Sequence, residues 1–422
     1  MNSKSAVPND PAAGILVIGA GPAGLMAAGR AGELGAKVTL LEKNDRAGLK
    51  LLLTGGSRCN VTNSAGLKAF IAAFGPNGKF LYRAFSVFSP ENLTGFLKSF
   101  GVPVRTDPDG KVFPADDKAQ SVLDALNCYV SRGKAKSLTG RASALLLRNG
   151  ALEGVEFSDG RRVLGDKVII ATGGMSYPGT GSTGDGYALA KQCGHTIVPL
   201  RPGLTALESD EPFIKDLQGL TLQDIRLTIL VDGKAAVSDK GELLFTHFGV
   251  SGPKLLVLSG TASDALAAGA SVELSLNLKP ELNPDALAAS IQSYFAANGA
   301  KQFASYLKAA LPASLAPVFE RRSGIDHGRQ CASITGAERG RIAGLLADFR
   351  LRLTRPRPLQ EATVTRGGVN LKEVDPRTLE SRLQPGLYFC GEVLDLDGIT
   401  GGYNLQEAFS TGYLAGQSAA GQ

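Results

Sequence analysis

The sequence predicts an α/β protein in which one domain, built from both ends of the chain, is interrupted by a β-rich and a helical region. Three observations predict this class. The chain opens with a strand–turn–helix–strand pattern, buried-strand patterns recur at 167–171 and 387–390, and the pattern between about 198 and 354 is different. At 422 residues the chain is also too long for one core, because domains usually contain about one to two hundred residues.

The opening pattern is a β-α-β unit. Residues 14–18 form a short apolar run that is typical of a buried parallel strand, and a glycine-rich turn follows at 19–24. The alanine-rich stretch 25–34 predicts a helix that Gly35 ends, and 37–41 predicts the next strand. This arrangement is typical of domains that bind nucleotides.

The remaining elements follow from periodicity and turn chemistry. Helices are predicted within 80–100 and at 121–130, 283–349 and 404–415, and strands at 142–157, 167–171, 225–231, 272–276 and 387–390. Asn149-Gly150 predicts a hairpin turn inside 142–157. We therefore expect a loose tail at 1–13, a discontinuous domain at 14–197 and 355–422, a β-rich insertion at 198–282 with 350–354, and a helical subdomain at 283–349.

Composition excludes several classes of protein. The net charge of +6 is modest for this length and no block of Lys and Arg occurs, so nucleic acid is not the expected partner. The excess is either an ordinary solvated surface or a field that attracts an anionic cofactor or substrate. No apolar run is long enough to cross a membrane, and 1–13 lacks the apolar core of a signal peptide, so we expect a cytoplasmic protein.

The cysteines and histidines predict neither a disulfide framework nor a metal site. The chain has five scattered cysteines with no Cys-x-x-Cys pair, which argues against a redox dithiol and against a secreted disulfide scaffold. Its three histidines are far apart and show no zinc spacing.

The turn after the first strand predicts a dinucleotide site. Gly19 permits the tight turn, Gly21 lets the backbone approach a pyrophosphate, and Gly24 lets helix and strand pack closely. The helix N-terminus supplies free N–H groups, and Glu42 at the end of the next strand can accept hydrogen bonds from ribose hydroxyls while repelling a 2′-phosphate. The predicted contacts also include Pro22, Ala23 and Lys43.

Later segments favour FAD over NAD. The strand at 169–171 ends in a turn, and a second strand near the C-terminus leads to an acidic residue and then to glycines at a helix start. Asp395 can bind the ribityl chain, and the final helix would point its positive end at the flavin N1–C2=O edge. The predicted FAD contacts from these segments are Thr172, Gly173, Gly174, Gly391, Glu392, Asp395, Gly402, Tyr403, Asn404 and Gln406.

Four stretches together resemble the BaiN/YhiN-type flavoproteins, a group of bacterial FAD proteins. They are 48–63, 171–187, 245–253, and the run from 365–369 through 391–392 to 406. The resemblance implies a Rossmann-type FAD-binding domain interrupted by an inserted antiparallel β-barrel-like region and a helical region. The chain departs from the family at Ser57, where a third glycine is usual, and at Leu49, where a basic residue is usual.

The resemblance also places part of the 48–63 loop against the cofactor. The residues carried over as FAD contacts are Lys50, Arg58, Cys59, Asn60 and Asn63. The alternative is a loop whose Asn side chains only satisfy turn backbone, and for Cys59 a small buried thiol is favoured over a redox role.

Candidate catalytic residues are His247, Tyr403 and Arg58. Histidine suits proton transfer near neutral pH, although His247 can equally hold a loop. The Tyr403 phenol can donate to a carbonyl substrate or only pack on the flavin ring. Asp185, in a glycine-rich turn, is either a binding turn for a transient nicotinamide nucleotide or the start of a helix.

These features predict an FAD-dependent oxidoreductase that transfers a hydride between flavin N5 and a small organic substrate. No second G-x-G-x-x-G follows a strand, so NAD(P)H would bind only transiently in the substrate cavity. The alternatives are an oxidase of a small amine or alcohol that uses oxygen, a tRNA-modifying flavoprotein, and a non-catalytic flavin-bound protein.

Overall fold

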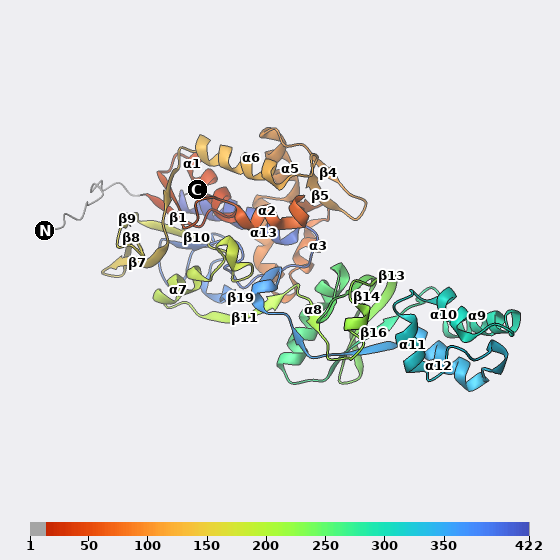
Figure 1. Ribbon diagram of the computed structural model, residues 1–422. Coiled ribbons are helices and arrows are strands. Elements are labelled where there is room, and N and C mark those ends of the chain that lie inside the picture. The colour runs from red at the N-terminus through yellow and green to blue at the C-terminus, as the bar shows by residue number, and fades with distance from the viewer. Residues whose placement is uncertain (1–13, 422) are drawn as a thin grey trace. The chain divides into compact units, whose positions relative to one another are not determined.

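The computed structural model describes residues 14–421, which form two compact units. Unit 1 extends to Arg201 and resumes at Leu359, and unit 2 is Pro202–Pro358 (Figure 1). The tail predicted at 1–13 lies outside the described residues. The finer boundaries of the β-rich and helical parts stay a prediction.

A five-stranded parallel sheet lies at the centre of unit 1. Its strands, in spatial order, are β20 (Leu387–Phe389), β10 (Lys167–Ile170), β1 (Ile15–Ile18), β2 (Val38–Glu42) and β6 (Lys136–Thr139). All neighbours pair in parallel. Ile15 and Val17 belong to one core cluster, whereas Leu16 and Ile18 belong to another, so both faces of the sheet are buried.

Helices cover one face of this sheet, where α1 packs against both α13 and α6 (Figure 1). The helices of this layer are α1 (Pro22–Glu33), α4 (Tyr82–Val87), α5 (Pro90–Ser99), α6 (Ala119–Arg132) and α13 (Tyr403–Ala419). Two glycines of α13 let this helix lie close to α1. A Cβ on Gly412 would lie 2.3 Å from the Ala23 carbonyl oxygen, and a Cβ on Gly416 would lie 2.4 Å from the Ala27 carbonyl oxygen.

The other face of the sheet packs against an antiparallel three-stranded sheet and α7. These elements are β7 (Ala142–Arg148), β8 (Ala151–Phe157), β9 (Arg162–Leu164) and α7 (Asp185–Gln192). Asn149 and Gly150 form the hairpin turn with φ of 51° and 82°, as the sequence predicts. Smaller elements complete the unit: α2 (Leu49–Leu53), α3 (Leu67–Ala72), β3 (Thr62–Asn63), β4 (Val104–Thr106), β5 (Lys111–Pro114), and the paired strands β11 (Ile197–Gly203) and β19 (Val364–Val369).

Unit 2 contains a seven-stranded antiparallel sheet. Its spatial order is β17 (Phe349–Leu353), β16 (Val272–Asn277), β13 (Thr221–Val231), β14 (Lys234–Phe245), β15 (Gly249–Ser251), β12 (Leu207–Glu208) and β18 (Arg355–Pro356). The two outer strands follow one another in the chain and are separated only by Thr354, whose N–H donates to the Glu208 carbonyl. The run 349–356 therefore joins both ends of the sheet and makes it barrel-like.

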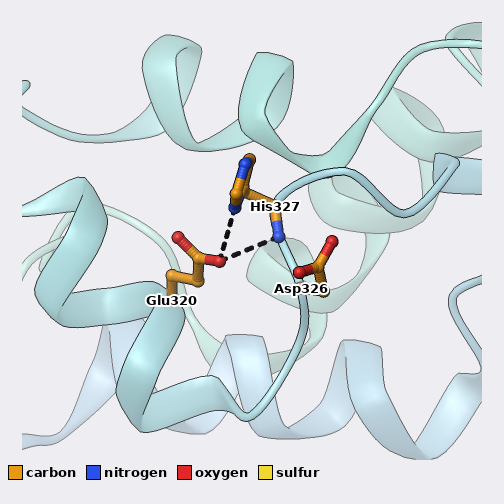
Figure 2. A group of neighbouring side chains, drawn as sticks. All are labelled: Glu320, Asp326 and His327. Atoms are coloured by element: carbon orange, nitrogen blue, oxygen red, sulfur yellow. Dashed lines mark hydrogen bonds and ion pairs between the residues drawn. The ribbon is translucent and has the colours of Figure 1, made fainter.

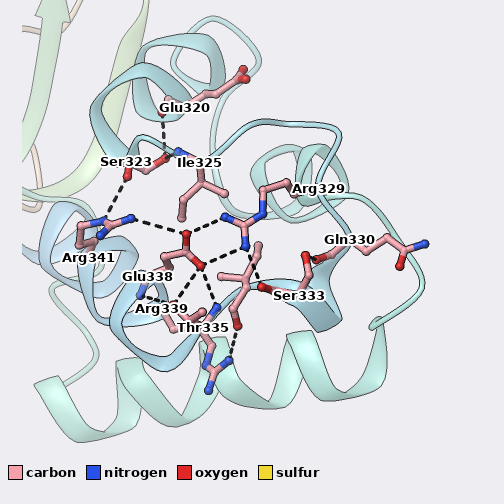
Figure 3. Close-up of polar contacts among 11 residues, drawn as sticks. Glu320, Ser323, Ile325, Arg329, Gln330, Ser333, Thr335, Glu338, Arg339 and Arg341 are labelled. Carbon is pink, nitrogen blue, oxygen red and sulfur yellow. Dashed lines mark hydrogen bonds and ion pairs between the residues drawn. The ribbon is translucent and has the colours of Figure 1, made fainter.

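The helices of unit 2 share the core of this sheet. They are α8 (Pro253–Ala267), α9 (Pro284–Ala297), α10 (Phe303–Ala310), α11 (Ala316–Ser323) and α12 (Gly336–Ala347). At the start of α12, Thr335 and Glu338 form a reciprocal capping box, and the Arg329 guanidinium donates to both Glu338 oxygens at 2.6 and 3.2 Å (Figure 3). These contacts lower the pKa of Glu338 to about 2 and hold the preceding loop on the helix.

Candidate FAD site

The turn between β1 and α1 forms the predicted pyrophosphate site. Gly19 has a φ of 103°, and its N–H donates to the Leu41 carbonyl. Gly21 caps α1 without a side chain, and Pro22 occupies the first turn. The first N–H groups of the helix therefore remain available to an anion, as a phosphate site requires.

The glycines of this turn differ in the space around them. A Cβ on Gly24 would lie 1.8 Å from the Gly19 carbonyl oxygen, so Gly24 is required for packing. A Cβ on Gly21 would meet no atom within 4 Å, and Gly21 has extended backbone angles that any residue adopts. Glycine at position 21 is thus needed neither for packing nor for backbone conformation, and the open space beside it fits a pyrophosphate.

Glu42 joins the two turns at the ends of β1 and β2. Its Oε2 accepts from the Ala20 N–H at 2.7 Å, and its Oε1 accepts from the backbone N–H and the side chain of Asn44 at 2.9 Å. The carboxylate is thereby fixed beside the glycine turn, where it can accept from a ribose hydroxyl. The Nζ of the neighbouring Lys43 pairs with Asp185 at 2.7 Å, and its contact with FAD stays a prediction.

Asp185 is the first residue of α7, after Gly184 at the N-cap. Burial opposes its ionisation, but hydrogen bonds from Arg141 and Lys43 hold the pKa of Asp185 below its usual range. Both cations already neutralise this carboxylate, which favours the helix-start interpretation of the residue.

Lys50 and Glu392, 342 residues apart in the sequence, form an ion pair of 2.6 Å. Lys50 also donates to Ser176 Oγ at 2.7 Å, and Glu392 Oε1 accepts from the Thr365 N–H at 2.7 Å. The pair ties the 48–63 loop, the turn after β10 and the C-terminal segment together. The same turn contains Gly173, with a φ of 70°, and Gly174, whose Cβ would lie 2.2 Å from Thr365 Oγ1.

The 55–59 loop has an unusual backbone. Gly55, Gly56, Ser57 and Cys59 all have φ between 56° and 72°, a region that favours glycine. Arg58 points into an ion pair with Asp117 at 2.9 Å and lies over the Phe113 ring. Its guanidinium is held by these partners in the structure.

Ser57 should cost stability for this reason, since its side chain is exposed and its φ is 72°. We expect Ser57→Gly to stabilise unit 1 by roughly 1 kcal/mol, about 2 °C in Tm, by calorimetry. The matched control is Gly56→Ser, which places the same side chain at φ 65° in equally open space and should destabilise. A lower Tm for Ser57→Gly would show that the serine hydroxyl stabilises the loop by more than its backbone conformation costs.

The end of this loop is buried and carries two polar atoms without a partner among the described residues. These are Asn60 Oδ1 and Thr62 Oγ1. Buried polar atoms are normally hydrogen-bonded, so both atoms fit a position beside a polar group such as those of FAD. Cys59 is fully buried, and burial raises the pKa of its thiol to about 12, which argues against a redox role. Asn63 donates to the Gly401 carbonyl at 3.0 Å.

The C-terminal segment ends at the N-terminus of α13. A Cβ on Gly402, with φ 94°, would lie 2.2 Å from the Thr62 carbonyl oxygen, so the helix start lies against β3. Gly402 has no capping side chain, which leaves the positive end of the helix available. Half-buried Asp395 accepts from Asn77 at 3.3 Å, and burial raises the pKa of its carboxyl.

The other predicted residues of this segment have partners within the protein. The Asn404 side chain bonds both the N–H and the carbonyl of Gly398 and closes that loop. Gln406 is fully buried and donates to the Phe88 carbonyl at 3.1 Å, while its Oε1 has no partner among residues 14–421. Tyr403 packs on Phe70 with ring centroids 4.7 Å apart.

A family model described as the HI0933-like protein Rossmann domain matches residues 13–418. The chain belongs to this family. Two of its relatives have different named activities. A 3-dehydro-bile acid delta(4,6)-reductase of Clostridium scindens is 33% identical over 408 residues, 96% of this chain and 98% of that protein. A ribosomal RNA dihydrouridine synthase of Escherichia coli is 30% identical over 406 residues, 95% of this chain and 96% of that protein.

Solved structures show the same fold at low identity. A flavocytochrome c3 fumarate reductase has a TM-score of 0.52 and 17% identity, covering 97% of this chain and 78% of that one. A 3-ketosteroid-delta4-(5alpha)-dehydrogenase from Rhodococcus jostii also has a TM-score of 0.52, with 16% identity and 97% coverage of both chains. The predicted Rossmann-type fold, the BaiN/YhiN-type resemblance and membership of an oxidoreductase family are confirmed. Among the described residues, no helix has the length and apolar character to span a bilayer.

One predicted catalytic residue and one group of titratable side chains lie in unit 2 of this HI0933-like protein. His247 packs edge-on against Phe248 at 4.9 Å, and its catalytic role stays a prediction. The structure also gathers Glu320, Asp326 and His327 at the surface (Figure 2). Glu320 Oε1 accepts from both the ring Nδ1 and the backbone N–H of His327, which raises the pKa of His327 and explains the grouping as a loop contact.

One buried acid, Glu407, has no signature in the sequence pattern. Glu407 lies in the second turn of α13 and is 3% exposed. Burial raises the pKa of its carboxyl to about 8, and Thr411 Oγ1 lies 3.3 Å from it. A glutamate near a helix N-terminus is ordinarily a surface residue that favours the helix dipole, so only the fold shows that it is buried.

Proposed function

We propose that this HI0933-like protein is an FAD-dependent reductase that saturates a carbon–carbon double bond conjugated to a carbonyl. The observation that carries the proposal is that its two differently named relatives share one bond change. A delta(4,6)-reductase of a 3-oxo steroid and a synthase of dihydrouridine both add two hydrogens to a double bond conjugated to a carbonyl. When bound, FAD supplies the two-electron chemistry of this reduction.

The residues of unit 1 have separable roles in this proposal. The Gly21 turn and the N-terminus of α1 bind the pyrophosphate, and Glu42 binds the adenosine ribose. The uncapped N-terminus of α13 stabilises negative charge beside it. The ion pair of Lys50 and Glu392 holds the 48–63 loop against the C-terminal segment.

We assign the proton that saturation requires to Tyr403. Burial raises the pKa of its phenol, so the hydroxyl stays protonated at neutral pH and can donate to the substrate. Arg58 is committed to Asp117, which favours Tyr403 over Arg58 for this role. NAD(P)H is the proposed reductant, bound transiently where the substrate binds.

Anaerobic stopped-flow mixing of the flavin-loaded protein tests the proposal. NADH or NADPH should bleach the flavin, and a conjugated steroid enone should restore its colour, whereas the saturated ketone should not. Tyr403→Phe should slow the enone step by about a hundredfold or more while leaving flavin reduction unchanged. Recovery by oxygen alone, with no effect of any enone, would replace the reductase by an oxidase.

A base in ribosomal RNA is a second candidate substrate. Two relatives, from Escherichia coli and Haemophilus influenzae, are each 30% identical over most of their length and are named ribosomal RNA dihydrouridine synthases. The net charge of +6 is compatible with a polyanion. The reduced protein should then add two hydrogens to a uridine of rRNA from a strain lacking the gene, detected by mass spectrometry, while free enones leave the flavin reduced.

A further inference from the structure

Unit 1 contains a cavity that belongs to none of the segments assigned to FAD. Its volume is about 620 Å³, within the range of roughly 300–1,000 Å³ of small-molecule sites. It lies among the C-terminal half of α1, α5, the end of α6 and the middle of α13. Gly32 and Glu33, at the last turn of α1, line it, whereas the pyrophosphate turn precedes the first turn of the same helix.

Aromatic rings form much of the wall. Phe88 and Tyr413 stack at 4.5 Å with an interplanar angle of 19°. Phe96 and Phe100 each meet Tyr129 edge-on, at 5.0 and 5.7 Å. Phe96 and Phe100 are only partly buried, so part of each ring remains available for a planar guest, whereas the Tyr413 ring already contacts Phe88 and Arg30.

Two arginines lie on these rings. The Arg30 guanidinium is 4.5 Å from the centroid of Tyr413, and that of Arg132 is 4.5 Å from the centroid of Phe100. One carboxylate, Glu33, faces them, and it already accepts from Arg30 and from the Tyr129 hydroxyl at 2.7 Å each. Hence the wall carries two guanidinium charges against one carboxylate.

Arg30 is paired with Glu33 and also donates to Gln417 Oε1 at 2.8 Å, so the excess positive charge of the wall lies on Arg132. Arg30 Nε is buried and has no partner among the described residues. Arg132 is exposed and contacts no carboxylate within ion-pair distance in the part of the chain that the structure describes. Guanidinium groups beside stacked rings recognise a flat ring that carries a phosphate or carboxylate.

We propose that this cavity is a second ligand site that binds a planar aromatic anion of nucleotide size, with its ring against the exposed parts of Phe96 and Phe100 and its anionic group on Arg132. The ligand is a free mononucleotide or a nucleotide of a single strand, which offer the same chemistry. Stacking on exposed aromatic side chains with arginine beside them is a general mode of nucleotide binding.

Isothermal titration of the flavin-loaded protein with UMP tests this site, because bound FAD occupies the dinucleotide turn. UMP should bind, and ribose 5-phosphate, which lacks the ring, should bind at least about tenfold more weakly. Arg132→Gln should weaken UMP by at least about tenfold. Lys98→Gln, which removes an exposed charge on α5 outside the cavity wall, should leave the affinity unchanged.

Phe100→Leu is the second variant, since it retains bulk and all charges but removes the ring under Arg132. It should weaken UMP severalfold while FAD content and Tm stay near those of the parent. If hexauridylate binds at least about tenfold more tightly than UMP, and Arg132→Gln loses this binding, the site belongs to an RNA strand. If hexauridylate and UMP bind with equal affinity, the site belongs to a free nucleotide. No binding of UMP, or equal losses in Arg132→Gln and Lys98→Gln, would overturn the proposal.

Discussion

Gly21→Val is expected to give a folded protein that has lost its FAD. The backbone at Gly21, φ −79° and ψ −177°, is available to valine, and no atom lies within 4 Å of the position of its Cβ. The variant should therefore keep the far-ultraviolet circular dichroism and most of the Tm of the parent apoprotein. The valine side chain would occupy the space assigned to the pyrophosphate, so we expect the ratio of FAD to protein to fall to roughly a tenth or less.

Two other glycine substitutions serve as controls for Gly21→Val. Gly344→Val places the same side chain in open space on the exposed face of α12 and should leave FAD bound. Gly24→Ala should damage folding itself, because its Cβ would lie 1.8 Å from the Gly19 carbonyl oxygen. A Gly21→Val protein that purifies fully loaded with FAD would mean that the pyrophosphate lies elsewhere and that the open space serves another purpose.

Local sequence patterns were sufficient for the elements that form this turn. The strand predicted at 14–18 is β1, Ile15–Ile18, and the helix predicted at 25–34 is α1, which begins three residues earlier at Pro22. Proline is favoured in the first turn of a helix, so its presence explains the earlier start. The short strands β3, β4 and β5, of two to four residues, were missed because such lengths carry almost no periodicity.

Contacts between residues that are distant in the sequence could not be predicted from local patterns. The contact of Lys43 with the cofactor stays a prediction, whereas the hydrogen bond of its side chain to Asp185, 142 positions away, becomes visible only when α7 and β2 are placed. The departure at Ser57 likewise acquired a physical meaning only from its φ of 72°. The residues that line the aromatic cavity, such as Arg30, Phe100 and Tyr413, come from three separate segments of the chain, so no local sequence motif predicts it.

Glu407→Gln is expected to remove the pH dependence that Glu407 imposes on the stability of unit 1. Burial, reinforced by the charge of Glu392 and opposed by a hydrogen bond from Thr411, raises the pKa of Glu407 from 4.5 to about 8. Between these values the folded protein holds a proton that the unfolded chain has released. Its free energy of unfolding therefore falls as the pH rises, by about 1.4 kcal/mol per pH unit at most.

Glutamine has nearly the same shape as the protonated acid and does not titrate, so the variant should lack this loss. Urea unfolding of the two proteins, each saturated with FAD, should give equal stabilities near pH 4.5 and a growing advantage for the variant up to about pH 8. Since all other groups titrate in both proteins, the difference isolates Glu407.

Glu33→Gln provides a control of opposite sign. Although burial opposes it, hydrogen bonds from Tyr129 and Arg30 lower the pKa of Glu33. Its contribution is present above the ordinary value of 4.5 and is lost as the pH falls below it, so this variant should approach the parent only in acid. A Glu407→Gln difference that stays flat with pH would mean that Glu407 is ionised in the folded protein. A buried anion requires a positive partner, and among the described side chains only Thr411 is close enough to bond it, so bound cofactor or the α13 N-terminus would then have to carry that charge.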